Sequence, residues 1–182
     1  VNAQGLVEDV QILSSNLVQN GSFSQIGSEQ ITNGDFSQLG SEVVVDGDFS
    51  SGASWGGDSN IAGGQLTKNT NGLAYQTTLP VSVNDYNVVV NVETLGPSLS
   101  IYLGGTQQLL SQGVNTIYMK SGGSNNFIGF NNGIGSVINS ISVKEVGQEF
   151  TLPTGWSVGE DKAVCDGTQT GNSGLVQQGG IK

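Results

Sequence analysis

Carboxylates are the side chains in this sequence best suited to acid–base catalysis. The chain of 182 residues contains no histidine, which removes Ser-His-Asp and Cys-His catalysis and most transition-metal sites. Hydrolysis of a glycoside needs two carboxylates about 5–10 Å apart across a cleft. Most acids in the predicted domain stand beside Gly, Ser or Asn, where Asp commonly stabilises turns. We therefore predict that the chain is not an enzyme. The acids considered are Asp46, Asp48, Asp58, Asp85, Glu93 and Glu145.

One place in the sequence has ligands suited to a metal ion. Asp46 and Asp48 flank Gly47, and turn carboxylates with backbone carbonyls are the oxygen ligands that calcium prefers. The same pattern is ordinary in a tight turn whose acids are solvated. We predict no bound metal, and calcium at Asp46 and Asp48 is the alternative interpretation.

Three aromatic residues are candidates for stacking on a sugar ring. Sugar binding uses exposed aromatic faces with Asn, Gln or Asp nearby for the hydroxyl groups. Tyr102 lies on the polar side of its predicted strand, beside Ser98 and Ser100, whereas Trp55 and Tyr75 lie near predicted loops. For Trp55 we favour a second interpretation, in which its ring plugs one end of a sandwich. The candidate ligand-binding residues are therefore Tyr102, Trp55 and Tyr75.

The composition excludes two classes of partner. Fifteen acidic residues against five lysines give a net charge of −10, and no arginine occurs. The chain therefore lacks the phosphate-binding forks and basic face of a nucleic-acid-binding protein, and the polybasic patch that binds anionic membranes. Cys165 is the single cysteine, so we expect no disulfide within the chain. Neither nucleic acid nor a membrane is a predicted partner.

Residues 43–147 have the pattern of an antiparallel β-sandwich. Short runs rich in β-branched residues alternate with turn signals, and the chain has 29 glycines and only 11% charged residues. In the run 85–94, apolar residues at every second position would face a core. Eight or nine short strands fit a jelly roll better than a closed barrel. The predicted strands are 43–46, 65–68, 73–79, 85–94, 98–103, 107–110, 116–120, 125–131 and 137–146.

A 13-residue repeat precedes and opens this region. Its copies are LVQNGSFSQIGSE (17–29), QITNGDFSQLGSE (30–42) and VVVDGDFSSGASW (43–55). Each copy has an apolar run, then Asn-Gly or Asp-Gly, which tolerate the positive φ of tight turns, then Phe and Ser. The third copy opens the sandwich, and the first two are openings without a domain of their own. The predicted organisation is an extended anchor (1–42), a jelly-roll sandwich (43–147) and the start of a second, incomplete module (148–182).

Residues 1–42 are interpreted as an anchor that binds other chains. Residues 1–16 fit an extended segment that becomes ordered against a partner, which we favour, or a short helix with an apolar stripe. The two repeats in 17–42 fit docking strips, which we favour because Phe and Ile or Leu recur at fixed places, or a flexible linker. Apolar strips of this kind are normally buried in assemblies, and the predicted assembly is a homotrimer.

Residues 148–182 weakly repeat the start of the sandwich. Trp55 matches Trp156, and the segment 72–76 matches 174–178. A third of a sandwich cannot bury its own apolar face. Either the sequence is a piece of a longer chain, which we favour, or these strands complete another subunit.

A series of motifs in this order resembles a known family. The series is NGxFS, GASWGG, GGQLT, AYQ, SLSIYLGG, SGGSNNFIGF and a closing ISVKEV. It is similar to the jelly-roll, carbohydrate-binding-module-like repeats of bacteriophage tail fibres and other virion appendages. The resemblance covers 43–147, with 17–42 as openings and 150–178 as a partial second copy.

The resemblance implies a structural protein of the virion, a fibre or decoration subunit. Residues 1–42 would anchor it to other virion proteins, and the sandwich would be displayed for attachment to a host-surface glycan. Because the same jelly roll occurs in secreted glycoside hydrolases, the alternative is a non-catalytic carbohydrate-binding module of such an enzyme. In calcium-binding relatives, acids near the opening Phe and before the last strand hold the ion. Here the second place is Asn139-Ser140, which has no carboxylate.

Overall fold

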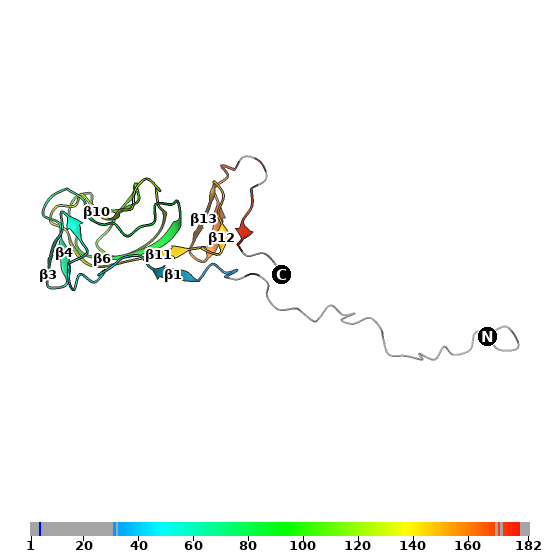
Figure 1. Ribbon diagram of the computed structural model, residues 1–182, viewed down its shortest axis with the longest axis horizontal. Coiled ribbons are helices and arrows are strands. Elements are labelled where there is room, and N and C mark those ends of the chain that lie inside the picture. The colour runs from blue at the N-terminus through cyan, green and yellow to red at the C-terminus, as the bar shows by residue number, and fades with distance from the viewer. Residues whose placement is uncertain (1–3, 5–30, 32, 170, 172, 179–182) are drawn as a thin grey trace. The chain divides into compact units, whose positions relative to one another are not determined.

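The computed structural model describes residues 4, 31, 33–169, 171 and 173–178. By their contacts, Val1–Gln30 and Ile31–Lys182 are separate units. Residues 1–3, 5–30 and 32 of the predicted anchor lie outside the described residues. The secondary structure of the described residues consists of antiparallel β-strands, which confirms the all-β fold class. Two sheets pack face to face as a sandwich, with β10 in one layer and β6 and β11 in the other (Figure 1).

The first layer is a six-stranded sheet. Five of its strands follow the order β3-β4-β11-β6-β9. The sixth, β1, pairs with the end of β11, on the same edge of β11 as β4. The long strands β6 and β11 pair over almost their whole length, with a register shift between Ile138 and Ser140. The strands are β1 (Leu39–Glu42), β3 (Asn60–Ala62), β4 (Gln65–Thr67), β6 (Asp85–Thr94), β9 (Gly113–Lys120) and β11 (Val137–Val146).

The second layer is a five-stranded sheet in the order β2-β5-β10-β7-β8. Its strands are short, and each pairs antiparallel with its neighbours. The strands are β2 (Gly56–Gly57), β5 (Ala74–Gln76), β7 (Ser100–Leu103), β8 (Thr106–Leu109) and β10 (Ile128–Asn131).

The core follows the predicted alternation of apolar residues. The inward residues of β6 are at most 1% exposed, and the same holds for the inward residues of the run 98–103. Fully burying one such side chain contributes about 1.5–3 kcal/mol relative to leaving it in water. The confirmed inward residues are Tyr86, Val88, Val90, Val92, Leu99, Ile101 and Leu103.

Most predicted strands occur, and two of them, 85–94 and 137–146, have the predicted bounds. The prediction of a strand at 43–46 is wrong, because β1 ends at Glu42. Beyond it, the Val43 amide still donates a backbone hydrogen bond to the Val143 carbonyl of β11 (2.9 Å). The short strands β1, β2 and β3 were not predicted. They carry little alternation of their own and become strands by pairing with longer neighbours.

The second and third repeat copies form the same turn. Asn33 and Phe36 have φ of 53° and 56°, and Asp46 and Phe49 have φ of 55° and 58°. In both copies the Phe amide donates to the carbonyl of the residue three before it, at 2.9 and 3.1 Å. Positive φ is uncommon for a residue with a bulky side chain. The positive φ therefore falls on Asn or Asp and on Phe, rather than on the glycine between them.

The two turns hold different partners. Phe49 packs on Trp55 inside the sandwich, with ring centroids 5.2 Å apart. Phe36 packs on Phe150, with centroids 5.0 Å apart, and Asn33 Nδ2 donates to Glu149 Oε2 (2.9 Å). The turn of the second copy therefore contacts the segment that follows the sandwich.

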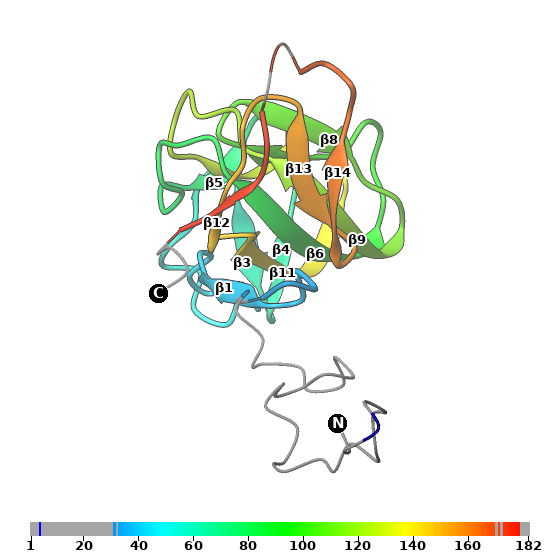
Figure 2. The same ribbon diagram turned by 90° about the vertical axis from the view of Figure 1, so that its right-hand side faces the viewer.

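The segment after the sandwich forms two small antiparallel pairs. β12 (Phe150–Thr151) pairs with β15 (Val176–Gln177), and β13 (Trp156–Gly159) pairs with β14 (Lys162–Cys165). The β13–β14 hairpin packs against β6 and β9 at the end of the sandwich where β11 ends (Figure 1; Figure 2 views this end). Lys120 on β9 joins the two parts, because its Nζ donates to the carbonyl of Trp156 (3.0 Å).

Candidate binding face on the five-stranded sheet

Two of the three predicted aromatic residues lie in one row across the five-stranded sheet. Tyr75 on β5 is directly opposite Gly129 on β10, and Gly129 is directly opposite Tyr102 on β7. Exposed Gln107 on β8 continues the row beyond Tyr102. Directly opposite residues of a sheet share a face, so the two tyrosines project from the same side with a glycine between them.

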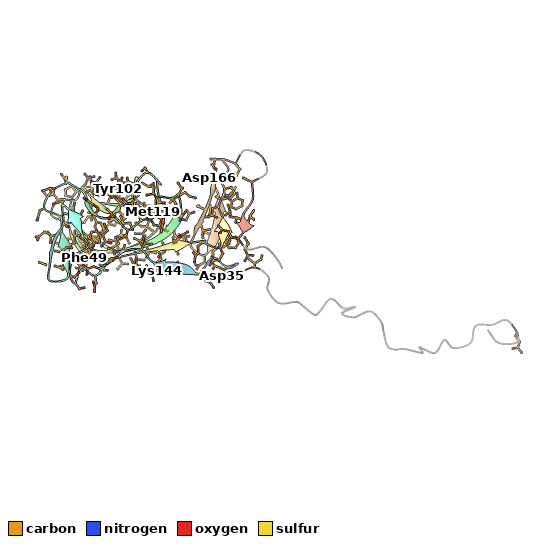
Figure 3. The ribbon with its side chains drawn as sticks, in the orientation of Figure 1. Asp35, Phe49, Tyr102, Met119, Lys144 and Asp166 are labelled. Carbon is orange, nitrogen blue, oxygen red and sulfur yellow. The ribbon has the colours of Figure 1, made fainter. Side chains whose placement is uncertain are left out.

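Strand alternation places this row on the outer face. On β7, Ile101 and Leu103 are fully buried, and Tyr102 between them is half-buried. On β5, Ala74 and Gln76 are buried and Tyr75 is half-buried. Both tyrosines therefore project from the outer face and are partly open to solvent. In Figure 3 Tyr102 lies on the side of the sandwich opposite Lys144.

Gly129 cannot be replaced without moving the backbone. A Cβ at this position would lie 1.8 Å from the carbonyl oxygen of Ala74, far inside contact distance. The absence of a side chain also keeps the strip between the two tyrosines low. The result is a shallow surface that a flat, ring-shaped ligand can approach.

A third aromatic residue extends the face. The ring of Phe127, just before β10, lies 4.7 Å from the ring of Tyr75 with an interplanar angle of 30°. Phe127 is not among the binding residues predicted from the sequence. The signal was present, because Ile128 and Phe130 are inward residues of the same strand, and period two then puts Phe127 on the outer face with Gly129.

Amide side chains border the aromatic rings and are held in place. Asn125 Nδ2 donates to Tyr102 Oη (2.7 Å), and Asn125 Oδ1 accepts from the Phe127 amide (3.0 Å). Gln107 Oε1 accepts from Ser100 Oγ (3.1 Å) and from Asn131 Nδ2 (3.0 Å). Fixed amides beside aromatic rings can exchange hydrogen bonds with sugar hydroxyls while the rings cover C–H surfaces.

Trp55 lies in the core and not on this face. It is 8% exposed, and its ring stacks on Phe130 with centroids 5.9 Å apart and an interplanar angle of 16°. Phe49 also packs against the Trp55 ring. The Nε1 of Trp55 donates to the carbonyl of Asp46 (3.1 Å). The ring has no free face for a ligand, which agrees with the favoured interpretation of Trp55 as a plug.

Asp46 and Asp48 stabilise the turn of the third repeat copy. Asp46 Oδ1 accepts from the Ser51 amide (3.0 Å) and Ser50 Oγ (3.0 Å), and Oδ2 accepts from the Gly52 amide (2.6 Å). These bonds, the one from the Ser51 amide above all, lower the pKa of Asp46 to about 2. Asp48 accepts from the Ser50 amide (3.2 Å). Within the described ranges, no group of three or more acidic, His or Cys side chains is placed to hold a metal ion.

Two other acids have raised pKa values but do not face each other. Burial raises the pKa of Asp85, which forms an ion pair with Lys120 (3.1 Å) that acts in the opposite direction. Burial also raises the pKa of Glu145, which accepts from Asn84 Nδ2 (3.1 Å). Asp85 is opposite Val146, the residue next to Glu145, so the two carboxylates project from opposite faces of the sheet. They do not flank a common cleft.

Comparisons with known proteins found no matching family model, no matching curated protein and no matching solved structure. Among the residues that the structure describes, no helix is long and apolar enough to cross a membrane.

Proposed function

We propose that the chain is a non-catalytic subunit of a virion appendage, whose sandwich binds glycans through the face formed by Tyr75, Phe127 and Tyr102. The observation that carries the binding proposal is the row Tyr75–Gly129–Tyr102, with fixed amides at its border. The face has no facing pair of carboxylates, so the ligand is bound and released unchanged. Like other shallow faces, it should bind weakly, in the range of about millimolar to micromolar.

The strand order supports a jelly roll. The four-stranded parts β4-β11-β6-β9 and β5-β10-β7-β8 have the arrangement of two Greek keys wrapped into two sheets. Lectin and viral capsid domains use this architecture. It fits both the appendage proposal and its alternative, a carbohydrate-binding module of a secreted glycoside hydrolase.

The binding proposal is tested on a glycan array with single substitutions. Tyr102→Ala and Tyr75→Ala should each weaken binding at least about tenfold, a loss of about 1.4 kcal/mol, because each removes one stacking ring. Tyr102→Phe keeps the ring and should retain most of the affinity. Tyr118→Ala is the matched control, since Tyr118 is also half-buried but belongs to β9 of the other sheet. Binding that survives both alanine substitutions would contradict this site.

The appendage proposal includes anchoring through the N-terminal segment and a trimeric assembly. Sedimentation of the full chain and of a variant lacking residues 1–30 separates the two functions. An appendage subunit should sediment as a trimer and lose the trimer on truncation. A monomer in both cases would favour the module of a secreted enzyme.

A further inference from the structure

The second repeat copy and the segment after the sandwich have the same order of ring contact and strand pairs as the opening third of the sandwich. Phe36 contacts Phe150 as Phe49 contacts Trp55, at ring distances of 5.0 and 5.2 Å. Trp55 stands just before β2, which pairs with β5, and Phe150 opens β12, which pairs with β15. In its contact with the repeat phenylalanine, Phe150 therefore corresponds to Trp55, whereas Trp156 opens the hairpin strand β13.

The two hairpins of these units also correspond. The β3–β4 turn is Gly63-Gly64, with φ of 61° and 76°, and the β13–β14 turn is Glu160-Asp161, with φ of 51° and 58°. Aligning the turns makes β14 the counterpart of β4, and Ala163 the counterpart of Leu66. We call residues 33–38 and 149–178 the partial unit. The sandwich is inserted between its two pieces.

The partial unit lacks the neighbours that complete its template. β4 pairs with β3 on one edge and with β11 on the other, whereas β14 pairs only with β13 in the part of the chain that the structure describes. Leu66 and Ala74 in the template are 0% exposed. Their counterparts are half-buried Ala163 on β14 and Val176 on β15, which is 62% exposed.

We propose that the free edge of β14 accepts a β-strand from a partner polypeptide, in the place that β11 has against β4. The partner strand runs antiparallel to β14 and carries apolar residues at alternate positions, with one of them opposite Ala163, as Ile138 is opposite Leu66. Residues 149–178 contain four acids and one lysine, so the partner strand is flanked by basic residues. A second copy of the chain cannot supply its β11, because β6 and β4 hold that strand on both edges.

The hydrogen-bond pattern identifies the amides that take part. The Asp166 amide donates to the carbonyl of Gly155, so this pair faces inward in the hairpin. Because donors alternate along an antiparallel strand, the amides of Lys162 and Val164 also point to β13. The amides of Ala163 and Cys165 point to the free edge. Ala163→Pro removes one of them at a position where an edge strand tolerates proline.

The experiment uses the full chain and a synthetic peptide with the sequence of Val137–Val146 and two added lysines at each end. Binding is measured by titration, and the amides are followed by hydrogen exchange. We expect saturable binding, at least tenfold slower exchange at Ala163 and Cys165, and no change at Lys162 and Val164. A control peptide with Ser in place of its Ile and Val residues should not bind.

The Ala163→Pro chain should not bind the peptide, and its sandwich should unfold at the same temperature as that of the unchanged chain. The control peptide leaves the protein unaltered, so the test stands even if the proline variant misfolds. The proposal is overturned if the peptide fails to bind or if the serine peptide binds equally well. It is also overturned if the chain alone self-associates and thereby protects Ala163 and Cys165, because the occupant would then be a second copy.

Discussion

The second and third repeat copies share the motif Gly-Asp-Phe-Ser and the same turn, yet they lie in different surroundings. Asp46 begins a turn whose Phe49 is 1% exposed in a complete sandwich. Asn33 begins the same turn, but its half-buried Phe36 meets Phe150 in a unit with few strands. The local conformation therefore belongs to the 13-residue motif, whereas the burial of its aromatic ring depends on distant strands.

The largest expected difference between the two copies is the cost of removing the aromatic ring. Phe49→Ala should destabilise the protein by about 3–5 kcal/mol, because it opens a cavity in a closed core. Phe36→Ala should cost less than half as much, since its ring is half-buried and the site can relax. Chemical denaturation of both variants measures this, and equal costs would show that the partial unit is as well packed as the sandwich.

A second contrast lies at the end of each hairpin. Lys68 follows β4, and its fully buried Nζ forms an ion pair with Asp58 (2.9 Å) and a hydrogen bond with the Phe130 carbonyl (3.3 Å). Its counterpart in the partial unit is exposed Cys165. Lys68→Ala should cost about 3 kcal/mol by leaving these groups unpaired.

Cys165→Ala is the matched control and should change stability by no more than about 0.5 kcal/mol. Thermal unfolding of the two variants measures both effects. A destabilising Cys165→Ala would mean that β14 is already covered in the protein in solution.

A third contrast concerns truncation. A chain without residues 1–30 sets the reference unfolding temperature, because the compact unit begins at Ile31. Removing residues 1–42 should lower it by a few degrees, since β1 then leaves β11 and Phe36 leaves Phe150. Differential scanning calorimetry of the two truncations checks this, and identical melting would count against a structural role for the second copy.

The smallest expected effect concerns the residue that begins each turn. In each copy this side chain accepts a hydrogen bond from the amide five residues later, from Ser51 to Asp46 (3.0 Å) and from Gln38 to Asn33 (2.9 Å). The side chain of Asp46 is charged, whereas that of Asn33 is neutral. The folded-state pKa of Asp46 is lowered from 3.8 to about 2, so its contribution is present above about pH 4 and is lost as pH falls through 2. Asp46→Asn should therefore be less stable than the unchanged chain at pH 5.

That gap in stability should narrow toward pH 2, where Asp46 is half-protonated in the folded chain and almost fully protonated in the unfolded chain. Urea denaturation at a series of pH values gives the difference between the two proteins. A gap that stays constant from pH 5 to pH 2 would show that the charge of Asp46 does not contribute.

Much of the candidate binding face followed from the sequence. The alternation of Leu99, Ile101 and Leu103 put Tyr102 on the outer face, because in a strand each residue points opposite to its neighbours. The same rule would have found Phe127. What the sequence could not give is that Tyr75 and Tyr102 lie in one row, since their registers with Gly129 depend on how β5 and β7 pair with β10.

The sequence by itself determined the elements whose information is local. Period-two alternation placed β6 and β11, and the Asn-Gly and Asp-Gly motifs placed the repeat turns, because backbone sterics and side-chain direction act within a few residues. Only the tertiary structure decided which aromatic rings become core. Trp55 is buried because Phe49 and Phe130 enclose it. Val176 is exposed because, among the described residues, no strand pairs with β15 as β10 pairs with β5 at Ala74. Burial is a property of the neighbours brought in by distant pairing, and similar local motifs therefore end in different environments.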